Sequence, residues 1–188
     1  ALISQGHKRL LLVSAEDPAV DIDYLEEMIM AVYETRNGRG SIRRLNVNVA
    51  PMGMKNFKRI KDTGIGTYQL FQETYHVDTY NKVHVSGPKT DYLKRLYACD
   101  DAQRSGIDDV GIGVLFGLYQ YKCEVMALLF HAMHLEERFG VGPHTISIPR
   151  LEPAQGSDIS SHPPYPVSDL ELKKIIAILR LAVPYTGI

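Results

Sequence analysis

Polar side chains that could bind a small molecule recur in this sequence where short apolar runs end. They comprise hydroxyls, carboxylates, an amide and a guanidinium, at Ser14, Glu16, Gln72, Glu73, Ser147 and Arg150. Because such groups are costly to bury without hydrogen-bonding partners, their recurrence after apolar segments favours a ligand site. Arg150 offers a planar fork for a carboxylate, and the alternative for it is an ion pair with Glu152 or Asp158.

Two asparagines share one face of the second apolar run. Asn46 and Asn48 alternate with Val47 and Val49, so one face of this segment is polar and the other is apolar. Interior positions of β/α barrels are normally filled by branched apolar side chains. The two amides therefore favour a polar ligand cavity over satisfied polar groups in a core.

Three glycines, Gly111, Gly113 and Gly117, fall within the fourth apolar run. Glycine weakens a strand interior unless something must approach the backbone closely, and we expect a bulky planar ligand to do so. The glycines lie within the run and not in a turn after it, so they do not form a phosphate-binding fingerprint.

Two further patterns have plain structural alternatives. Glu16 and Asp17 could equally begin a helix, where carboxylates suit the helix dipole. His131, His134 and Glu136 could share a helix flank, but their spacing differs from the HExxH zinc motif and predicts no metal site.

The apolar runs are short and rich in β-branched residues, which favours strands. They cover residues 8–15, 42–50, 67–73, 109–117, 144–151 and 183–188. Helices are predicted over about 20–36, 53–63, 90–105, 121–139 and 168–181, the last begun by a capping box of Ser168 and Glu171. Alternating strands and helices imply parallel pairing, and the pattern fits about strands 2 to 7 of a (β/α)8 TIM-type barrel. In such a barrel, residues that follow the strands form the active face.

The ends and the composition limit the classes of function. The chain starts without Met and stops inside a predicted strand, so we expect residues 1–188 to be a single domain, an internal fragment of a barrel. A net charge of -1 and the lack of a basic run argue against nucleic acid or an anionic membrane as partner. The longest uncharged apolar run, 125–130, is too short to span a bilayer. Cys99 and Cys123 share no metal-ligand spacing and indicate a reducing, cytoplasmic compartment.

Several segments together resemble one enzyme family. They are QETYH at 72–76, GPK at 87–89, GIDDVGIGVLFGLY at 106–119, HLEERFGVGPHTISIPRL at 134–151 and LRLAVPYTGI at 179–188. The chain resembles the radical S-adenosylmethionine (radical SAM) tyrosine lyases, most closely the branch that acts in FeFe-hydrogenase maturation. The shorter set QETY, GPK and PRL is shared with the thiamine-pathway branch, the 2-iminoacetate synthases, which stay an alternative. A cluster-free barrel that binds an amino acid or nucleoside is another.

The resemblance implies a radical reaction. In such enzymes a 4Fe-4S cluster reduces S-adenosylmethionine to a 5′-deoxyadenosyl radical, which takes a hydrogen atom from tyrosine. Cleavage of the Cα–Cβ bond then gives p-cresol and dehydroglycine. In the hydrogenase branch an auxiliary C-terminal iron-sulfur cluster converts dehydroglycine into carbon monoxide and cyanide. A reductant and the hydrogenase maturation proteins are the implied partners, while the difficult chemistry belongs to the cofactors.

The resemblance also implies roles for individual residues. Ser14, Ala15 and Glu16 stand in the place of a Gly-Gly-Glu-like motif that receives the methionine amino group, although Ala15 departs from glycine. The other implied contacts are to the nucleoside by Gln72 and Glu73, to the adenine by Gly111 and Gly113, and to the substrate carboxylate by Ser147 and Arg150. Asn46 and Asn48, on the polar face of their strand, are also predicted to bind the cofactor.

Some of the residues that the resemblance implies have more than one candidate in this chain, and others are absent from it. Relatives place an arginine before Gly106 to pair with the cofactor carboxylate, and Arg95 and Arg104 are both candidates. His84 is a weak candidate ligand of auxiliary iron. The chain contains no CxxxCxxC, the spacing that holds the radical SAM cluster, so the cluster ligands are expected outside this fragment.

Overall fold

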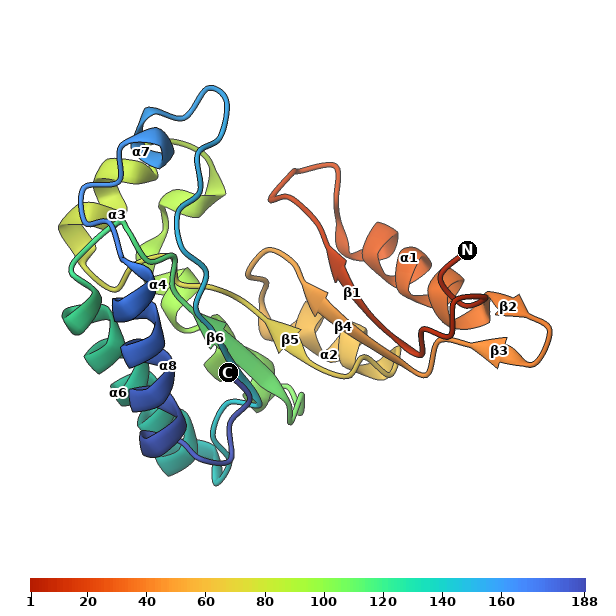
Figure 1. Ribbon diagram of the computed structural model, residues 1–188. Helices are drawn as coiled ribbons and strands as arrows, with labels where there is room; N and C mark the ends of the chain where they lie inside the picture. The colour runs from red at the N-terminus through yellow and green to blue at the C-terminus, as the bar shows by residue number, and fades with distance from the viewer. The chain divides into compact units, whose positions relative to one another are not determined.

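The computed structural model describes residues 1–188 as parallel strands alternating with helices (Figure 1). The chain divides into two compact units. The first unit comprises residues 1–70 and 97–110, and the second comprises residues 71–96 and 111–188. None of the helices combines the length and the apolar character needed to cross a bilayer.

The first unit is built on three parallel strands in the order β1-β4-β5. Its elements are β1 (Arg9–Val13), α1 (Ile22–Glu34), β4 (Arg44–Asn48), α2 (Met54–Asp62), β5 (Tyr68–Gln69) and α5 (Ala98–Arg104). The register pairs Leu11 with Asn46 and Val47 with Tyr68. A short antiparallel hairpin of β2 (Arg36–Asn37) and β3 (Gly40–Ser41) connects α1 to β4.

The apolar face of β4 explains how this unit packs. Leu45 and Val47 are buried, while Asn46 and Asn48 on the alternate face are half-exposed. Phe57 of α2 is fully buried and meets the ring of Tyr68 edge-on, with 4.8 Å between ring centroids. The alternation predicted from the sequence therefore divides β4 into a packed face and a polar face.

The second unit contains β6 and β7, which pair in parallel, together with several helices. Its elements are α3 (Val77–Val83), the 3-10 turn η1 (Pro88–Thr90), α4 (Tyr92–Leu96), β6 (Val110–Gly113, whose first residue ends the first unit), α6 (Tyr121–Phe139), β7 (Thr145–Ser147), α7 (Asp158–Ser161) and α8 (Asp169–Ala182). The register pairs Gly111 with Thr145 and Gly113 with Ser147. Parallel bridges of Glu73 with Val114 and of Phe116 with Arg150 prolong the pairing beyond the strands.

The predicted α/β class with parallel strands is confirmed, and so are most of the elements. Helix α6 has the predicted bounds, and α8 begins with the predicted capping box, in which the Ser168 side chain accepts from the backbone N–H of Glu171. The strand predicted over 183–188 is wrong. Thr186 N donates to Val183 O at 3.1 Å, so the chain turns there and only Gly187 makes a parallel bridge, to Thr145.

The single helix predicted over 90–105 is also wrong. Asp91 Oδ1 accepts from Lys94 N at 2.9 Å and so begins α4 as a separate short helix. Tyr97, at ψ 6°, then separates α4 from α5. The hairpin at 36–41 and the short helices α3 and α7 were not predicted, because each is too short to show a hydrophobic period.

Candidate functional site

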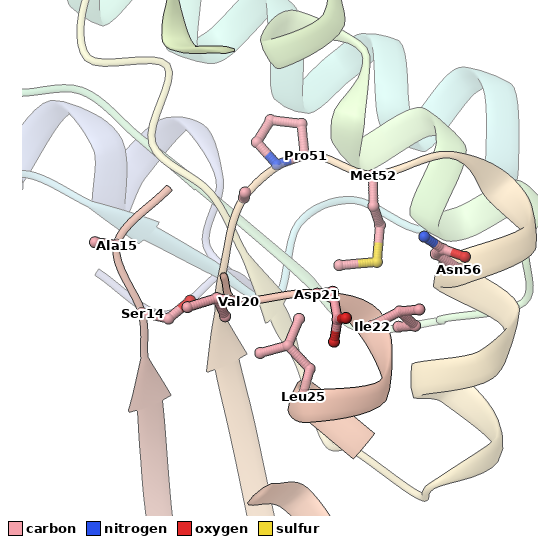
Figure 2. Close-up of a pocket in the computed structure, with 10 residues that line it drawn as sticks. Ser14, Ala15, Val20, Asp21, Ile22, Leu25, Pro51, Met52 and Asn56 are labelled. Atoms are coloured by element: carbon pink, nitrogen blue, oxygen red, sulfur yellow. The ribbon is translucent and has the colours of Figure 1, made fainter. Parts of the chain in front are cut away.

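The first unit contains a pocket of about 230 Å³ where β1 and β4 end (Figure 2). Figure 2 shows Ser14 and Ala15 on the segment after β1, Pro51 and Met52 on the segment after β4, and Asn56 on α2. Val20, Asp21, Ile22, Leu25 and Ala50 complete the lining. The carboxyl ends of two parallel strands and the start of α1 thus enclose a concave site, as in other β/α proteins.

Ser14 provides the buried polar atom of this pocket that lacks a partner. Its Oγ atom is buried and makes no hydrogen bond, although its backbone N–H donates to Asn48 O at 3.2 Å. Asp21, by contrast, is used by the fold, since its Oδ1 accepts from Tyr24 N at 2.9 Å and caps α1. A buried hydroxyl is normally hydrogen-bonded, so the Ser14 hydroxyl is the group of this pocket that a ligand could satisfy.

Three other predicted residues of the first unit, Glu16, Asn46 and Asn48, lie outside the pocket lining. Glu16 is half-exposed and does not line the pocket. Asn46 Oδ1 accepts from Arg44 Nε at 3.3 Å, and Arg44 Nη2 also binds Thr67 Oγ1 and the carboxylate of Asp109. The amide oxygen of Asn46 is therefore engaged in a polar chain within the unit.

Glu73 is the centre of a charged cluster in the second unit. Its Oε1 lies 2.7 Å from Lys89 Nζ and 3.2 Å from Arg95 Nη2. Arg95 is 7% exposed, and its Nε donates to Phe71 O at 2.7 Å. Glu73 also has a φ of 69°, which non-glycine residues rarely adopt. Conformations of this kind cost about 1–3 kcal/mol and persist where the surroundings enforce them, often at functional sites.

His84 lies near this cluster, and its charged form is disfavoured. Desolvation by burial lowers the pKa of His84, opposed by the hydrogen bond to the Tyr80 carbonyl, and the nearby Lys89 and Arg95 lower it further. The His84 Nδ1 hydrogen bond to Tyr80 O measures 3.0 Å, so Nδ1 carries the proton and Nε2 presents a lone pair. Lys89 and Arg95 thus both contact the carboxylate of Glu73, beside a His84 side chain whose charged form is disfavoured.

Arg95 and Arg104, the two candidate partners of the cofactor carboxylate, differ in their surroundings. Arg95 joins the Glu73 cluster in the second unit. Arg104 belongs to the first unit and pairs on its own helix with Asp100 and Asp101. Arg95 is thus the arginine located beside another predicted site residue.

Gln72 is buried without any side-chain partner. The residue is 3% exposed, and neither Oε1 nor Nε2 makes a hydrogen bond. Its backbone N–H does pair, donating to Gly113 O at 2.9 Å. An unsatisfied buried polar group costs about 1–3 kcal/mol, and such groups call for an explanation in a native fold. A bound ligand that engages the amide supplies one.

Gly113 is required by the packing of the chain itself. A Cβ at this position would lie 2.7 Å from Ser147 O and 2.9 Å from Phe71 Cδ1. No side chain fits there without movement of the neighbouring backbone. The expected approach of a ligand to Gly111 and Gly113 stays a prediction, since this close contact already accounts for a glycine at 113.

Arg150 makes an ion pair with an acid that the sequence did not suggest. Its Nη1 binds Asp169 Oδ1 at 2.7 Å and Val167 O at 3.1 Å, so Asp169 takes the place of the expected Glu152 or Asp158. Both contacts use Nη1, which leaves the edge formed by Nε and Nη2 for a ligand. Ser147 is half-buried at the end of β7, and its carbonyl accepts from Val114 N at 3.3 Å.

Sequence reasoning missed two charged residues of the second unit. Lys89, which was noted only within the GPK motif, binds Glu73, and Glu124 is buried against the turn that follows Glu73. The signal for Lys89 was its place in that motif. Glu124 gave no signal, because a carboxylate in the first turn of a helix is ordinary.

The side chains of this chain do not by themselves form a complete iron-sulfur site. No group of three His, Cys, Asp or Glu side chains is arranged to hold a metal ion. Cys99 is buried, and burial raises the pKa of its thiol to about 12, whereas Cys123 is exposed. His131, once considered with His134, binds the Tyr75 hydroxyl through Nδ1 at 2.7 Å. The unpaired Ser14 hydroxyl and Gln72 amide do fit a polar organic cofactor.

Comparison with known proteins identifies the relatives of this chain. It is 56% identical to HydG, a maturase of the [FeFe]-hydrogenase, covering 99% of this chain and 41% of that one with a TM-score of 0.96. HydG from Carboxydothermus hydrogenoformans is 49% identical, with 97% and 41% of the two chains covered and a TM-score of 0.89. The resemblance to radical SAM enzymes is confirmed.

More distant relatives share the same segment. The 2-iminoacetate synthase of Escherichia coli (strain K12) is 30% identical over 98% of this chain and 47% of its own length. The pattern of the Biotin and Thiamin Synthesis associated domain matches residues 147–188. The chain therefore spans about half the length of this curated relative and less of HydG.

Proposed function

We propose that this chain is part of a radical SAM tyrosine lyase of the kind that works in FeFe-hydrogenase maturation. The identity of 56% to HydG, against 30% to 2-iminoacetate synthase, supports the hydrogenase branch. The chain covers 41% of HydG, so the cluster-binding loop and the auxiliary cluster domain belong to the remainder of the parent protein in this proposal.

The single observation that carries the proposal from geometry is the charged cluster at Glu73. Arg95 and Lys89 both bind the carboxylate of Glu73, and the buried amide of the preceding residue, Gln72, has no partner. An amino-acid carboxylate could bind one of these cations, and a nucleoside hydroxyl or base edge could satisfy the amide. S-adenosylmethionine carries all of these groups in one molecule, with Arg95 as the partner of its carboxylate.

In the first unit we assign the pocket beside Ser14 to the methionine amino group of the cofactor. The Ser14 hydroxyl can accept a hydrogen bond from an ammonium group, and Ala15 lines the same pocket. Glu16, Asn46 and Asn48 complete the predicted cofactor-binding set, although Asn46 must share its amide oxygen with Arg44. Gly111 and Gly113 keep their proposed place beside the adenine.

Tyrosine is the proposed substrate, held through its carboxylate by Ser147 and Arg150. The Nε and Nη2 edge of Arg150 can bind both oxygens of one carboxylate, because Asp169 and Val167 occupy only Nη1. Orientation of the amino acid by this fork would hold it ready for hydrogen abstraction.

The cofactors supply the chemistry that the side chains lack. A bound 4Fe-4S cluster with S-adenosylmethionine supplies a hydrogen-abstracting radical, and its ligands lie outside this chain in the proposal. His84, with its Nε2 lone pair, is the proposed ligand of auxiliary iron. A reductant, the hydrogenase maturation proteins and a cytoplasmic location complete the proposal.

The test uses the full-length parent protein with its clusters reconstituted, incubated with tyrosine, S-adenosylmethionine and a reductant. We expect p-cresol together with carbon monoxide and cyanide. Formation of p-cresol without carbon monoxide would support the second candidate, the thiamine-pathway 2-iminoacetate synthase, which the match of residues 147–188 also favours. No p-cresol at all would refute both candidates.

A further inference from the structure

Glu124, in the first turn of α6, is a buried carboxylate that makes no salt bridge. The residue is 1% exposed. Its Oε1 accepts a hydrogen bond from the Thr74 hydroxyl, and its Oε2 accepts one from the backbone N–H of Tyr75 at 3.0 Å. Burial raises the pKa of this carboxyl, while the hydrogen bonds from Thr74 and Tyr75 and the charge of the nearby His76 oppose the shift. A carboxylate so costly to bury calls for an explanation that the proposed reaction does not give.

The bonds of Glu124 continue into the turn after Glu73. Thr74 is fully buried, and its Oγ1 also accepts from the backbone N–H of His76 at 3.1 Å. One carboxylate thus fixes three consecutive residues, 74 to 76, through two direct bonds and one relayed bond. Such a buried and fully hydrogen-bonded network rigidifies the backbone that it holds.

Glu73 lies between this network and a second anchor. Its carbonyl accepts from Leu115 N at 2.8 Å, so the backbone is held before and after the residue. Held in this way, Glu73 keeps its φ of 69° and directs its carboxylate onto Lys89 and Arg95. Release of the 74–76 turn would let φ return to the commoner negative range, and the carboxylate would move away from the two cations.

We propose that Glu124 is a positioning residue for the cofactor site, acting through Thr74 and Tyr75 to hold Glu73 in the conformation that forms the cluster of Glu73, Lys89 and Arg95. This inference rests on the proposed function, in which that cluster receives S-adenosylmethionine. Glu124 itself touches neither cofactor nor substrate. A positioning role, unlike general packing, requires that the effect of changing Glu124 be coupled to one particular residue, Glu73.

The experiment is a double-mutant cycle in the full-length parent protein, read out as the dissociation constant of S-adenosylmethionine. Glu124→Gln keeps the shape but turns an N–H₂ group toward either Thr74 or Tyr75, which are both donors. We expect this variant to weaken binding about tenfold, and the double variant with Glu73→Gln to bind no more weakly than Glu73→Gln alone. Glu137→Gln, an exposed carboxylate on the same helix, is the matched control and should bind normally.

Thr74→Val provides a second variant in case Glu124→Gln fails to fold. It removes one hydroxyl at similar volume and should weaken binding in the same direction by a smaller factor. A lowered unfolding temperature with an unchanged dissociation constant, or strictly additive effects in the cycle, would overturn the positioning role. If the wild-type protein binds no S-adenosylmethionine, the proposed function is rejected instead. If Glu73→Gln alone leaves the dissociation constant unchanged, Glu124 does not act through the Glu73 cluster.

Discussion

The two compact units offer a ligand different kinds of interaction. The pocket of the first unit is lined mainly by apolar side chains, and its one charged residue, Asp21, already caps α1. The second unit instead concentrates charge, with Lys89 and Arg95 around Glu73 and a buried, unpaired amide at Gln72. A ligand of the first unit would therefore meet mainly an apolar surface and one unpaired hydroxyl, whereas a ligand of the second unit would meet charged groups.

This difference predicts where substitutions matter. Changes in the second unit should alter affinity through charge and should respond to salt, because electrostatic contacts are screened. Changes in the pocket of the first unit should alter affinity through fit and should respond little to salt. The predictions below test that distinction, beginning with the largest expected effect.

Arg150→Ala in the full-length parent should raise the KM for tyrosine on the order of a hundredfold, because a carboxylate loses its charged fork. The iron content should stay unchanged. Steady-state kinetics with an iron assay measure both quantities. Asp169→Asn is the matched control, since it removes the partner of Nη1 and keeps the fork. An unaltered KM for tyrosine in Arg150→Ala would show that Arg150 does not bind the substrate carboxylate.

Gly113→Ala should lower the free energy of unfolding by about 1–3 kcal/mol, because the new methyl group meets the backbone oxygen of Ser147. Gly142→Ala is the control in the same unit, since its Cβ would meet nothing closer than 3.9 Å. Denaturant unfolding of the two variants gives the comparison. Equal stability of both would mean that close packing does not require glycine at 113.

Glu124 should make stability fall as pH rises. Because burial raises its folded-state pKa above the unfolded value of 4.5, the folded state binds the proton more tightly. Its stabilising contribution is complete below pH 4.5 and is lost as pH rises through the folded pKa. Unfolding measured against pH for wild type and Glu124→Gln should give a difference curve with this slope. A difference curve that rises with pH would mean that the folded-state pKa of Glu124 is lowered and not raised.

Ser14→Ala should have the smallest effect on stability, since its hydroxyl has no partner to lose. Removal of an unsatisfied buried polar group is expected to leave the unfolding free energy unchanged or raised by about 1 kcal/mol. The affinity for S-adenosylmethionine should still fall, with little dependence on salt. A destabilised variant with normal affinity would show that the hydroxyl serves the fold and not the ligand.

Local signals in the sequence were enough to predict much of the fold. The capping box of Ser168 and Glu171 and the long helical period of residues 121–139 depend on neighbours within one or two turns. The chain after α8 was mispredicted because its apolar residues suit a strand, while a turn closed by Thr186 and Val183 leaves room for only one bridge.

The candidate site was less accessible from the sequence, because its contacts join distant residues. The sequence indicated Glu73 and Arg150, but not that Lys89 would pair with one and Asp169 with the other. The sequence could not decide between Arg95 and Arg104 as the partner of the cofactor carboxylate. Only the fold shows that Arg95 lies beside Glu73, whereas Arg104 pairs on its own helix. No pattern of residue types reveals that the Gln72 amide is buried without a partner.

The most direct test compares Arg95→Met with Arg104→Met in the full-length parent, measuring the dissociation constant of S-adenosylmethionine at low and high salt. Arg95 belongs to the charged cluster of the second unit and Arg104 does not. We predict that Arg95→Met weakens binding at least about tenfold and reduces its salt dependence, while Arg104→Met binds like wild type. Equal affinities for the two variants would contradict the assignment of the cofactor carboxylate to the Glu73 cluster.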